Sequence, residues 1–412
     1  MKFQELKEKE FREFLNTQPL NDFIQAPEME KIGKLSNWTS YYVGVKENDK
    51  ILAATRLMAR PSRFGKQNFY APRGLILDYN NKELLSFFTR ELKKFIKKRN
   101  GYILTIDPAL IYQERDIDGK IVTDGINNQS IIDSLISLGY HHLGFTKKMD
   151  VSTQVRFTFV LDLKDETEDS IFSNMKPNTR NLIRKAMKDG IEIRELSYDE
   201  LDRFKKITKA TGERRNFLDR DLNYYQTMYK IFHEKEEVHF LLASLNLENY
   251  LNQLKTQLEN EKEKINQLII KNSNSKSSKM QIKNCEQLIN SLDKKIASTT
   301  KMLEEDGKII DLSAAMFMTY GNEVVYLFSG NIEKYMKFNA QYLIQWHMIK
   351  YALRNHFPRY NFYGISGIFD RNDPDYGVYE FKRGFNGHVE EYIGAFELPI
   401  SWYYYLHKLL KR

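Results

Sequence analysis

The sequence predicts an α/β fold of the α+β type, built as two domains with a helical hairpin inserted into the second. Three observations lead to this prediction. The chain has 412 residues, more than one hydrophobic core usually serves. Segments with strand and helix patterns alternate in both halves of the chain. Between those halves, residues 246–307 show a heptad pattern with almost no strand signal.

The first half opens with a predicted β-hairpin at residues 41–60, where two β-rich runs flank a polar turn. Residues 68–77, NFYAPRGLIL, predict the next strand. Residues 82–99 predict an amphipathic helix because their apolar side chains share one helical face. A strand at residues 101–108, GYILTIDP, follows, and residues 130–144 then predict a helix that a glycine ends.

A similar order returns in the second half. Residues 324–331 predict a strand, residues 339–356 an amphipathic helix and residues 359–366 another strand. Gly74 and Gly330 stand at comparable strand ends, which favours an internal duplication of one hairpin–helix–strand unit. An α/β chain can also show this order by chance.

The heptad pattern predicts two antiparallel helices separated by the polar stretch NSNSKSS. Each helix has roughly 25 residues, so the pair would extend about 40 Å at a rise of 1.5 Å per residue. The hairpin is either an insertion packed against the body or an arm that reaches a large partner. The apolar positions that define the pattern are Leu247, Leu251, Leu254, Leu258, Ile265, Leu268, Ile282, Cys285, Ile289, Leu292, Ile296 and Leu303.

Composition narrows the function classes. The formal net charge of +8 favours anionic partners such as phosphates, nucleic acid or anionic lipid, although a solvated basic surface gives the same excess. The single cysteine, Cys285, excludes a disulfide within the chain and suits a reducing compartment. The N-terminal residues lack a signal-peptide pattern, and no apolar run reaches the roughly 18 residues of a spanning helix, so we expect a cytoplasmic protein.

Common catalytic motifs are absent from the sequence, which has no G-x-S-x-G, H-E-x-x-H, Walker or G-x-G-x-x-G pattern. His141 and His142 are adjacent, so their side chains do not converge as metal ligands do, and we expect no metal. A glycine-rich turn of the kind that cradles the pyrophosphate of CoA is not evident either.

One basic stripe is predicted on a helix that Asn178 or Thr179 would cap. Arg180, Arg184 and Lys188 are four residues apart and therefore share a face. Such a stripe suits a phosphate-rich ligand, and it suits a solvated helix face equally well.

Three further positions suggest a site. Arg220 and Tyr224 share a helical face if a helix begins near Asp219, and arginine grips phosphate bidentately. Asp107 ends a predicted strand before a proline, a pair that is also typical of turns. Lys382 lies between an aromatic residue and an arginine and is followed by a glycine, which is not typical of a strand interior.

Taken together, these segments resemble the Fem family of peptidoglycan interpeptide-bridge aminoacyltransferases over essentially the whole chain. The resemblance rests on the heptad hairpin and on the segments NFYAPRGLILDY, ILTIDP, RNLIRKAMKDGI, RYNFYGISG, DYGVYEFKRGFN and EEYIGAFELPI.

For the fold, the resemblance implies two GNAT-like (acyl-CoA N-acyltransferase-like) domains that lie side by side. The first would span residues 1–148, with residues 394–412 returning to it, and the second would span residues 149–393. The hairpin at residues 246–307 would be an arm inserted in the second domain, similar to the tRNA-binding arm of seryl-tRNA synthetase.

For the activity, the resemblance implies transfer of Gly, Ala or Ser from aminoacyl-tRNA to the stem-peptide lysine, or to the growing bridge, of a lipid-linked peptidoglycan precursor (lipid II). The ester is already activated, so no cofactor is expected and aminoacyl-tRNA serves as co-substrate. The implied location is cytoplasmic, with peripheral contact to the inner face of the membrane. Association with itself or with related transferases is also implied.

For the chemistry, the resemblance implies that Lys382 contacts the 3′ end of the aminoacyl-tRNA and stabilises developing charge there. Phe381 would stack near the terminal adenosine, with a core aromatic as the alternative. Asp107 would be the general base, although substrate groups can relay the proton instead. Tyr102 would neighbour Asp107 in the site.

For the acceptor, the resemblance implies that Lys34, Arg220 and Tyr224 hold the diphosphate of the precursor, with Lys31 as a competitor for the first of these. The peptide channel would be lined by aromatic side chains, namely Tyr326, Tyr363 and Tyr379. At least one of these three would pack in the hydrophobic core instead.

Two other functions compete with this one. The first is an acyl-CoA-dependent N-acyltransferase of the GNAT type, which an occupied pyrophosphate loop would reveal. The second is a tRNA- or membrane-binding module whose transferase site has decayed. The presence of Asp107, Arg220 and Lys382 argues against decay.

Overall fold

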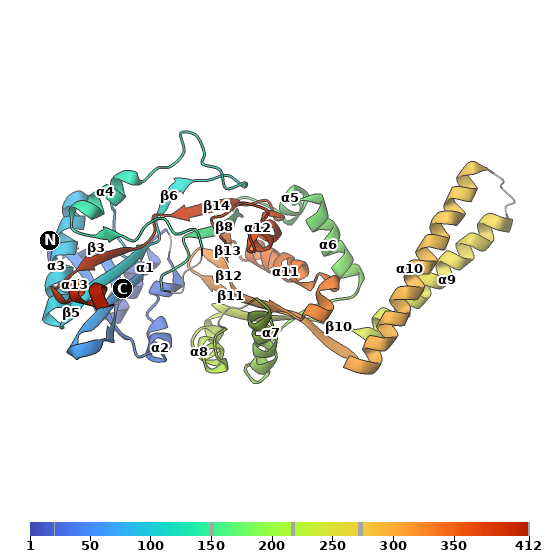
Figure 1. Ribbon diagram of the computed structural model, residues 1–412, viewed down its shortest axis with the longest axis horizontal. Coiled ribbons are helices and arrows are strands. Elements are labelled where there is room, and N and C mark those ends of the chain that lie inside the picture. The colour runs from blue at the N-terminus through green and yellow to red at the C-terminus, as the bar shows by residue number, and fades with distance from the viewer. Residues whose placement is uncertain (20, 149–151, 216–218, 271–274, 411–412) are drawn as a thin grey trace.

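The computed structural model describes residues 1–412 except for residues 20, 149–151, 216–218, 271–274 and 411–412. Two lobes lie side by side, each built on one β-sheet, and a long helical hairpin projects from the second lobe (Figure 1). Among the described residues, no helix is both long enough and apolar enough to cross a membrane.

The first lobe contains a seven-stranded sheet of order β1-β2-β3-β4-β5-β15-β7. Its hairpin, predicted at residues 41–60, is confirmed as β2 and β3, which pair antiparallel. The predicted strand at residues 68–77 is shorter than expected, because Arg73 takes a φ of +56° that interrupts the extended backbone. The strands are β1 (Lys2–Glu5), β2 (Thr39–Glu47), β3 (Lys50–Pro61), β4 (Gln67–Arg73), β5 (Gly101–Pro108), β7 (His141–His142) and β15 (Phe396–Pro399).

Helix α3 (Lys82–Lys98) joins β4 to β5, which run parallel. Its apolar stripe is buried against the sheet as the period of the sequence predicts, and Phe88 and Leu92 are fully covered. Helix α4 (Gln129–Ser137) ends before Gly139, whose positive φ suits a glycine at a helix end. The other helices of this lobe are α1 (Glu8–Asn16), α2 (Met29–Lys34) and α13 (Tyr403–Leu410).

The second lobe contains an eight-stranded sheet of order β6-β14-β8-β13-β12-β11-β10-β9. Here β12 and β13 run parallel and are joined by α11 (Ala340–Arg354), as β4 and β5 are joined by α3. This shared parallel unit supports the predicted internal duplication. The strands are β6 (Ile111–Glu114), β8 (Phe157–Asp162), β9 (Glu192–Glu195), β10 (Val238–Asn246), β11 (Ile309–Tyr320), β12 (Glu323–Asn331), β13 (Arg359–Gly364) and β14 (His388–Tyr392).

The chain crosses between the lobes more than once. Strand β6 precedes residue 148, yet it pairs with β14 at the edge of the second sheet. Strand β15 follows the second lobe in sequence, yet it pairs with β5 in the first sheet. The remaining helices of the second lobe are α5 (Glu168–Asn174), α6 (Pro177–Lys188), α7 (Leu201–Arg215), α8 (Leu222–Phe232) and α12 (Tyr376–Arg383).

One hydrophobic core is common to both lobes. It brings Phe11 and Met29 of the first lobe together with Phe204, Tyr225 and Met316 of the second. Burial of this apolar area favours one fixed arrangement of the lobes over independent motion.

The projecting hairpin consists of α9 (Leu247–Ile270) and α10 (Lys276–Asp306). Leu254, Leu258, Cys285 and Leu292 are buried between the two helices, as the heptad pattern predicts. The hairpin extends away from the body (Figure 1), so it is an arm and not an insertion packed on the surface. At its base the backbone N–H of Leu247 donates to the carbonyl of Lys308, which brings the two ends of the arm together.

Candidate active site

Lys382 is buried on α12, with 4% of its surface exposed. Its Nζ donates to the carbonyl oxygens of Gly364 at 2.7 Å and Tyr363 at 3.2 Å, at the end of β13. The ring centre of Tyr326 lies 5.9 Å from Nζ. Burial lowers the pKa of Lys382 from 10.5 to about 7, because a charged ammonium is disfavoured away from water. The side chain therefore points into the protein and changes charge near neutral pH.

Phe381 lies on the same short helix and is half-buried. Its ring centre is 4.8 Å from that of Tyr342 on α11 and 5.6 Å from that of Phe385. Other aromatic side chains therefore fix the orientation of the Phe381 ring. Only the exposed part of this ring could stack on a nucleotide base.

Asp107 is buried at the end of β5 and accepts three hydrogen bonds. The donors are the Tyr70 hydroxyl at 2.5 Å, the Arg73 backbone N–H at 2.7 Å and the Gln154 backbone N–H at 2.8 Å. Burial raises the pKa of Asp107, and the Arg73 guanidinium opposes this shift. The carboxylate ties the end of β4 to the segment that leads into the second lobe.

Gln154 connects Asp107 with the Lys382 region. Its side-chain Oε1 accepts a hydrogen bond of 3.1 Å from the Tyr363 hydroxyl, while its backbone N–H donates to Asp107. Since the carbonyl of Tyr363 accepts a hydrogen bond from Lys382, Asp107 and Lys382 are linked across the two lobes through Gln154 and Tyr363.

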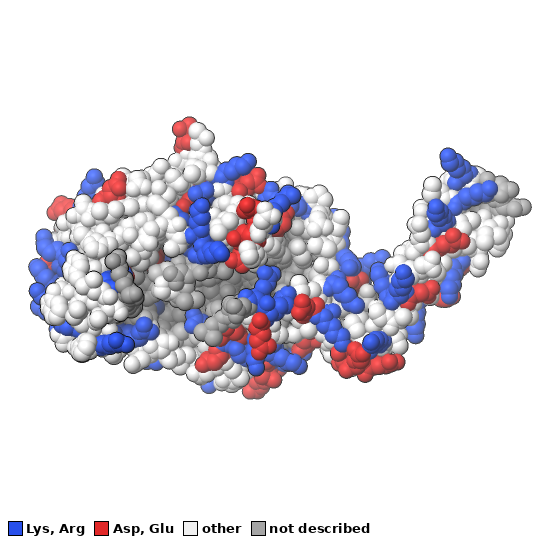
Figure 2. All heavy atoms as spheres, viewed as in Figure 1, with Lys and Arg blue, Asp and Glu red and all other residues white. Residues whose placement is uncertain are grey.

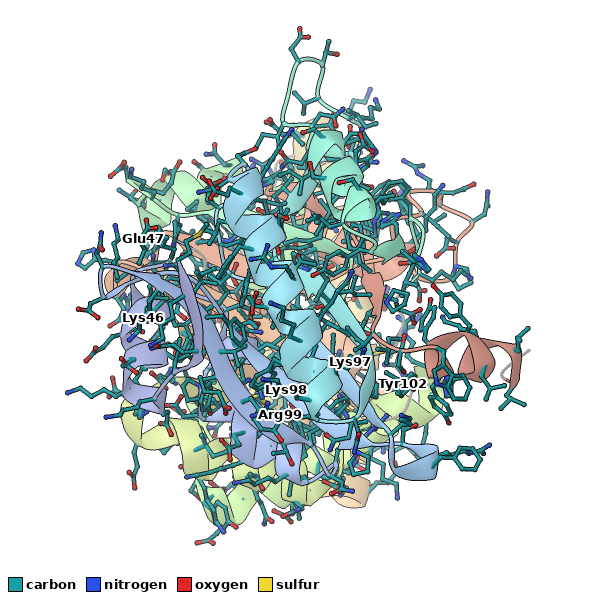
Figure 3. The ribbon with its side chains drawn as sticks, turned by 90° about the vertical axis from the view of Figure 1, so that its left-hand side faces the viewer. Lys46, Glu47, Lys97, Lys98, Arg99 and Tyr102 are labelled. Atoms are coloured by element: carbon teal, nitrogen blue, oxygen red, sulfur yellow. The ribbon has the colours of Figure 1, made fainter. Side chains whose placement is uncertain are left out.

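Tyr102 is not brought to this site, which corrects the expectation that it neighbours Asp107. The two residues lie at opposite ends of β5, about 16 Å apart at the rise of an extended strand. The Tyr102 ring packs against Tyr403 and His407, with ring centres at 5.1 and 5.2 Å. Figure 3 shows Tyr102 beside the C-terminal helix, near the end of α3.

The three tyrosines expected in the peptide channel have different surroundings. Tyr326 is buried, and its hydroxyl contacts Ser329 and Gln341, both at 2.5 Å. The Tyr379 hydroxyl donates to the carbonyl of Ile117 at 2.7 Å, so this side chain has a structural role in α12. Tyr363 adopts a φ of +63°, a conformation that a bulky residue rarely takes.

Tyr363 also lines a pocket of about 280 Å³ between the lobes. Charged residues from both lobes line this pocket, and two arginines among them contact neighbouring side chains. Arg73 lies 4.3 Å from the ring centre of Tyr392, and Arg359 pairs with Glu323 and Glu390 at 2.5 Å each. No pattern in the sequence predicts a role for these residues in the site, although Arg73 lies within the NFYAPRG segment.

The residues expected to bind the diphosphate lie on elements that contact each other. Helix α2 carries Lys34 and packs on α8, which follows Arg220. The Lys34 Nζ is 2.7 Å from Glu30, and its side chain is exposed. Helix α8 begins at Leu222 and not near Asp219, so Arg220 precedes it.

The Arg220 guanidinium nevertheless lies 5.2 Å from the ring centre of Tyr224, because the side chain folds back over the first helical turn. Burial raises the pKa of Tyr224, and this phenol is therefore a neutral donor at physiological pH.

The basic stripe is present on α6, with Arg184 and Lys188 exposed and Arg180 half-buried. The helix begins at Pro177 after Lys176, and not at a cap from Asn178 or Thr179 as expected. Its first residues contact α12: the Lys176 N–H donates to the carbonyl of Gly384 at 3.0 Å.

The other end of α6 lies at the base of the arm. Ile183 and Ala186 of α6 are buried in the same hydrophobic cluster as Tyr250 and Leu254, which lie near the start of α9. The stripe therefore leads from the helix that holds Lys382 to the arm. Within the part of the chain that the structure describes, no three His, Cys, Asp or Glu side chains gather as a metal site.

Comparison with known proteins agrees with this architecture. The family model described as the FemAB family matches residues 6–412. The chain is 36% identical over 405 residues to the aminoacyltransferase FemA of Staphylococcus aureus strain MRSA252, covering 97% of this chain and 96% of the relative. It is 35% identical over 405 residues to the same enzyme of strain N315, with the same coverage. A crystal structure of FemX matches all of both chains, with a TM-score of 0.75 and 24% identity.

These matches identify the class of protein first: a mixed α/β protein with two sheets and a projecting helical arm, which shares the fold of FemX and confirms the predicted α/β fold class. The chain belongs to the FemAB family and is an aminoacyltransferase.

Proposed function

We propose that this enzyme transfers an amino acid (Gly, Ala or Ser) from aminoacyl-tRNA to the stem-peptide lysine, or to the growing bridge, of lipid-linked peptidoglycan precursor at the cytoplasmic face of the membrane. One observation carries the proposal. The buried Lys382 lies on a helix that contacts the start of the basic α6, and α6 runs to the base of the projecting arm. A tRNA whose body lies along the arm and α6 would bring its 3′ end to Lys382.

The reaction needs no redox step. A neutral acceptor amine attacks the ester carbonyl, a C–N bond forms, and an oxyanion develops on the carbonyl oxygen. The C–O bond to the ribose then breaks, and the proton lost by the amine ends on the ribose oxygen. Because a free lysine amine has a pKa of about 10.4, the acceptor has to lose a proton before attack. Proximity and oxyanion stabilisation supply most of the acceleration.

Lys382 suits the stabilising role. Two of the three N–H donors of an ammonium are used by the carbonyls of Tyr363 and Gly364. We assign the third donor to a substrate oxygen that gains negative charge. In a buried site, this charge–charge interaction is stronger than it is in water.

For Asp107, the three hydrogen bonds that it accepts favour a positioning role, because its oxygens are already engaged in holding the two lobes. Its role as a general base stays a prediction. Lys34, Arg220 and Tyr224 are proposed to hold the diphosphate of the acceptor, since α2 and α8 pack together. Association with related transferases also stays a prediction.

The test incubates purified enzyme with radiolabelled Gly-, Ala- or Ser-tRNA and lipid-linked precursor. We expect transfer from one of the three. Lys382→Met should lower the rate at least about 100-fold, the usual loss when one charge-stabilising donor is removed. Lys9→Met on α1, which changes an exposed lysine, is the matched control. Transfer from none of the three donors would refute the proposal, and unchanged turnover in Lys382→Met would refute the role of this lysine.

A further inference from the structure

The end of α12 packs directly against the start of α6. Gly384 follows the last residue of α12, and its φ of −59° and ψ of −24° are values that any residue adopts. The backbone conformation at this position therefore does not require a glycine. Space does require one, because a Cβ atom placed on Gly384 would lie 2.3 Å from the Oγ1 of Thr179 on α6. That distance is far shorter than normal contact between atoms that are not bonded.

Thr179 has little freedom to move away from Gly384. The residue is 3% exposed and lies in the first turn of α6, close after Pro177. A β-branched side chain in a helix has few rotamers open to it. On either side of this contact, Ile183 of α6 and Phe385 are buried in one hydrophobic cluster. The junction between α6 and α12 therefore leaves no room for a side chain at position 384.

Two hydrogen bonds cross the same junction. The backbone N–H of Lys176, just before α6, donates to the carbonyl of Gly384 at 3.0 Å, and its Nζ donates to Glu380 of α12 at 3.0 Å. Helix α12 has eight residues, and a helix of that length is not stable by itself. Its position in the protein therefore depends on contacts with neighbouring elements such as α6.

We propose that Gly384 and Thr179 are positioning residues for aminoacyl transfer, because their contact sets the distance between α6 and the helix that carries Lys382. Figure 2 shows Lys and Arg side chains on the second lobe towards the base of the arm, where Figure 1 places α6. A tRNA bound there would meet Lys382 at a distance fixed by this junction. The inference rests on the proposed function, in which α6 contacts the tRNA and Lys382 the reacting ester.

The geometry gives the size of the expected effect. A methyl group on residue 384 needs about 1 Å more room to reach normal contact with Thr179, and a misplacement of that size can lower a rate about 100-fold. Lys382 is two residues away, and its Nζ donates to the carbonyl of Gly364 at 2.7 Å. A shift of α12 by that amount would take this pair beyond hydrogen-bonding distance.

The first test is the kinetics of transfer by the full-length enzyme, with radiolabelled aminoacyl-tRNA and lipid-linked precursor. Gly384→Ala should lower kcat about 10- to 100-fold and change KM little, because Lys382 is displaced from its position in the transition state. Gly377→Ala is the matched control. It adds the same methyl group to the same helix, where the group meets open space, and it should keep the wild-type kcat.

A second substitution separates a positioning role from a general loss of stability. In Gly384→Ala combined with Thr179→Ala, Oγ1 is gone and the nearest atom of residue 179 is its Cβ, at 3.5 Å. The double variant should therefore have the kcat of Thr179→Ala alone. A double variant as slow as Gly384→Ala would overturn the proposal, and so would a wild-type kcat in Gly384→Ala. If Gly384→Ala does not fold, the double variant should fold, and failure of both would overturn the proposal.

A further measurement does not depend on activity. At pH 9, acetic anhydride should acetylate the buried Lys382 slowly relative to the exposed Lys9. The relative rate should rise in Gly384→Ala, because the shift of α12 uncovers the lysine, and should return in the double variant. The same relative rate in every variant would overturn the proposal. If the expected pattern appears but the wild-type enzyme transfers no amino acid, the proposed function is refuted and the positioning of Lys382 by this contact stays supported.

Discussion

Tyr363 of the second lobe donates a hydrogen bond of 3.1 Å from its hydroxyl to the side-chain oxygen of Gln154, the residue whose backbone N–H binds Asp107. The carbonyl of the same Tyr363 accepts from Lys382. Tyr363, whose φ of +63° is strained for a bulky residue, therefore lies between Asp107 and Lys382 in this series of hydrogen bonds.

Tyr363→Phe removes the hydrogen bond between the lobes but keeps the ring. We expect a loss of about 0.5–1.5 kcal/mol in the free energy of unfolding, typical of one hydrogen bond. Tyr379→Phe also removes one hydroxyl bond, to Ile117, and is the matched control. Both variants should be destabilised to a similar extent in urea, but only Tyr363→Phe should slow aminoacyl transfer, since it alone removes a hydrogen bond of the series that links Asp107 through Gln154 to Tyr363. Equal activity in the two variants would argue against that connection.

Lys382→Met should change how stability depends on pH. The folded state holds Lys382 with a pKa of about 7, well below the ordinary 10.5. Between these two values the unfolded chain binds more protons than the folded protein, so this residue makes stability rise with pH. Below pH 7 Lys382 is charged in both states, so burial of the charge lowers the stability by its full amount. Above pH 10.5 it is neutral in both states, and burial of charge no longer lowers the stability. Methionine carries no charge at any pH.

The measurement is the free energy of unfolding in denaturant at pH 7 and pH 10 for both proteins. Lys382→Met should be the more stable of the two at pH 7, by as much as a few kcal/mol, because one pKa unit corresponds to about 1.4 kcal/mol. The difference should shrink at pH 10. A difference that is the same at both pH values would show that the lysine is not desolvated.

Asp107→Asn should destabilise the fold and slow transfer. Both carboxylate oxygens of Asp107 accept from a backbone N–H, and an amide group would present an N–H₂ to one of these donors. We expect a cost of about 1–3 kcal/mol. The pH–rate profile of the variant separates the two roles. If Asp107 is the general base, the variant loses the acidic limb of the profile. If Asp107 only positions other groups, the rate falls by the same factor at every pH and the shape of the profile is unchanged.

Replacing residues 247–306 with a short Gly-Ser linker should raise the KM for whole aminoacyl-tRNA and leave the KM for a minimal aminoacyl acceptor stem unchanged. The hydrogen bond from Leu247 to Lys308 shows that the two ends of the arm meet, so a short linker can close the gap. Kinetics with both donors provide the measurement. Equal KM values for whole tRNA would mean that the arm does not contact it.

Much of the fold follows from local periodicity. The helix α3, the helix α11 and the arm were predictable because each has a continuous apolar stripe of helical period. The end of β4 was not, since a single residue with positive φ, Arg73, stops the strand without any change in apolar pattern.

The candidate site was only partly predictable. The sequence predicts Lys382, Tyr363 and Tyr326 as site residues, and the structure places them together. The sequence predicts Tyr102 there as well, but the length of β5, which carries both residues, keeps Tyr102 far from Asp107.

The sequence by itself determined two α/β units, the helical arm and the residue types available for aminoacyl transfer, because these depend on short-range periodicity and on motif segments. Only the tertiary structure decided which of those residues meet. Gln154 and the charged pocket residues Arg73 and Arg359 join segments far apart in the chain, through sheet order and through crossings between the lobes. The lowered pKa of Lys382 was decided at the same level, since it arises from burial, which is a property of the assembled fold.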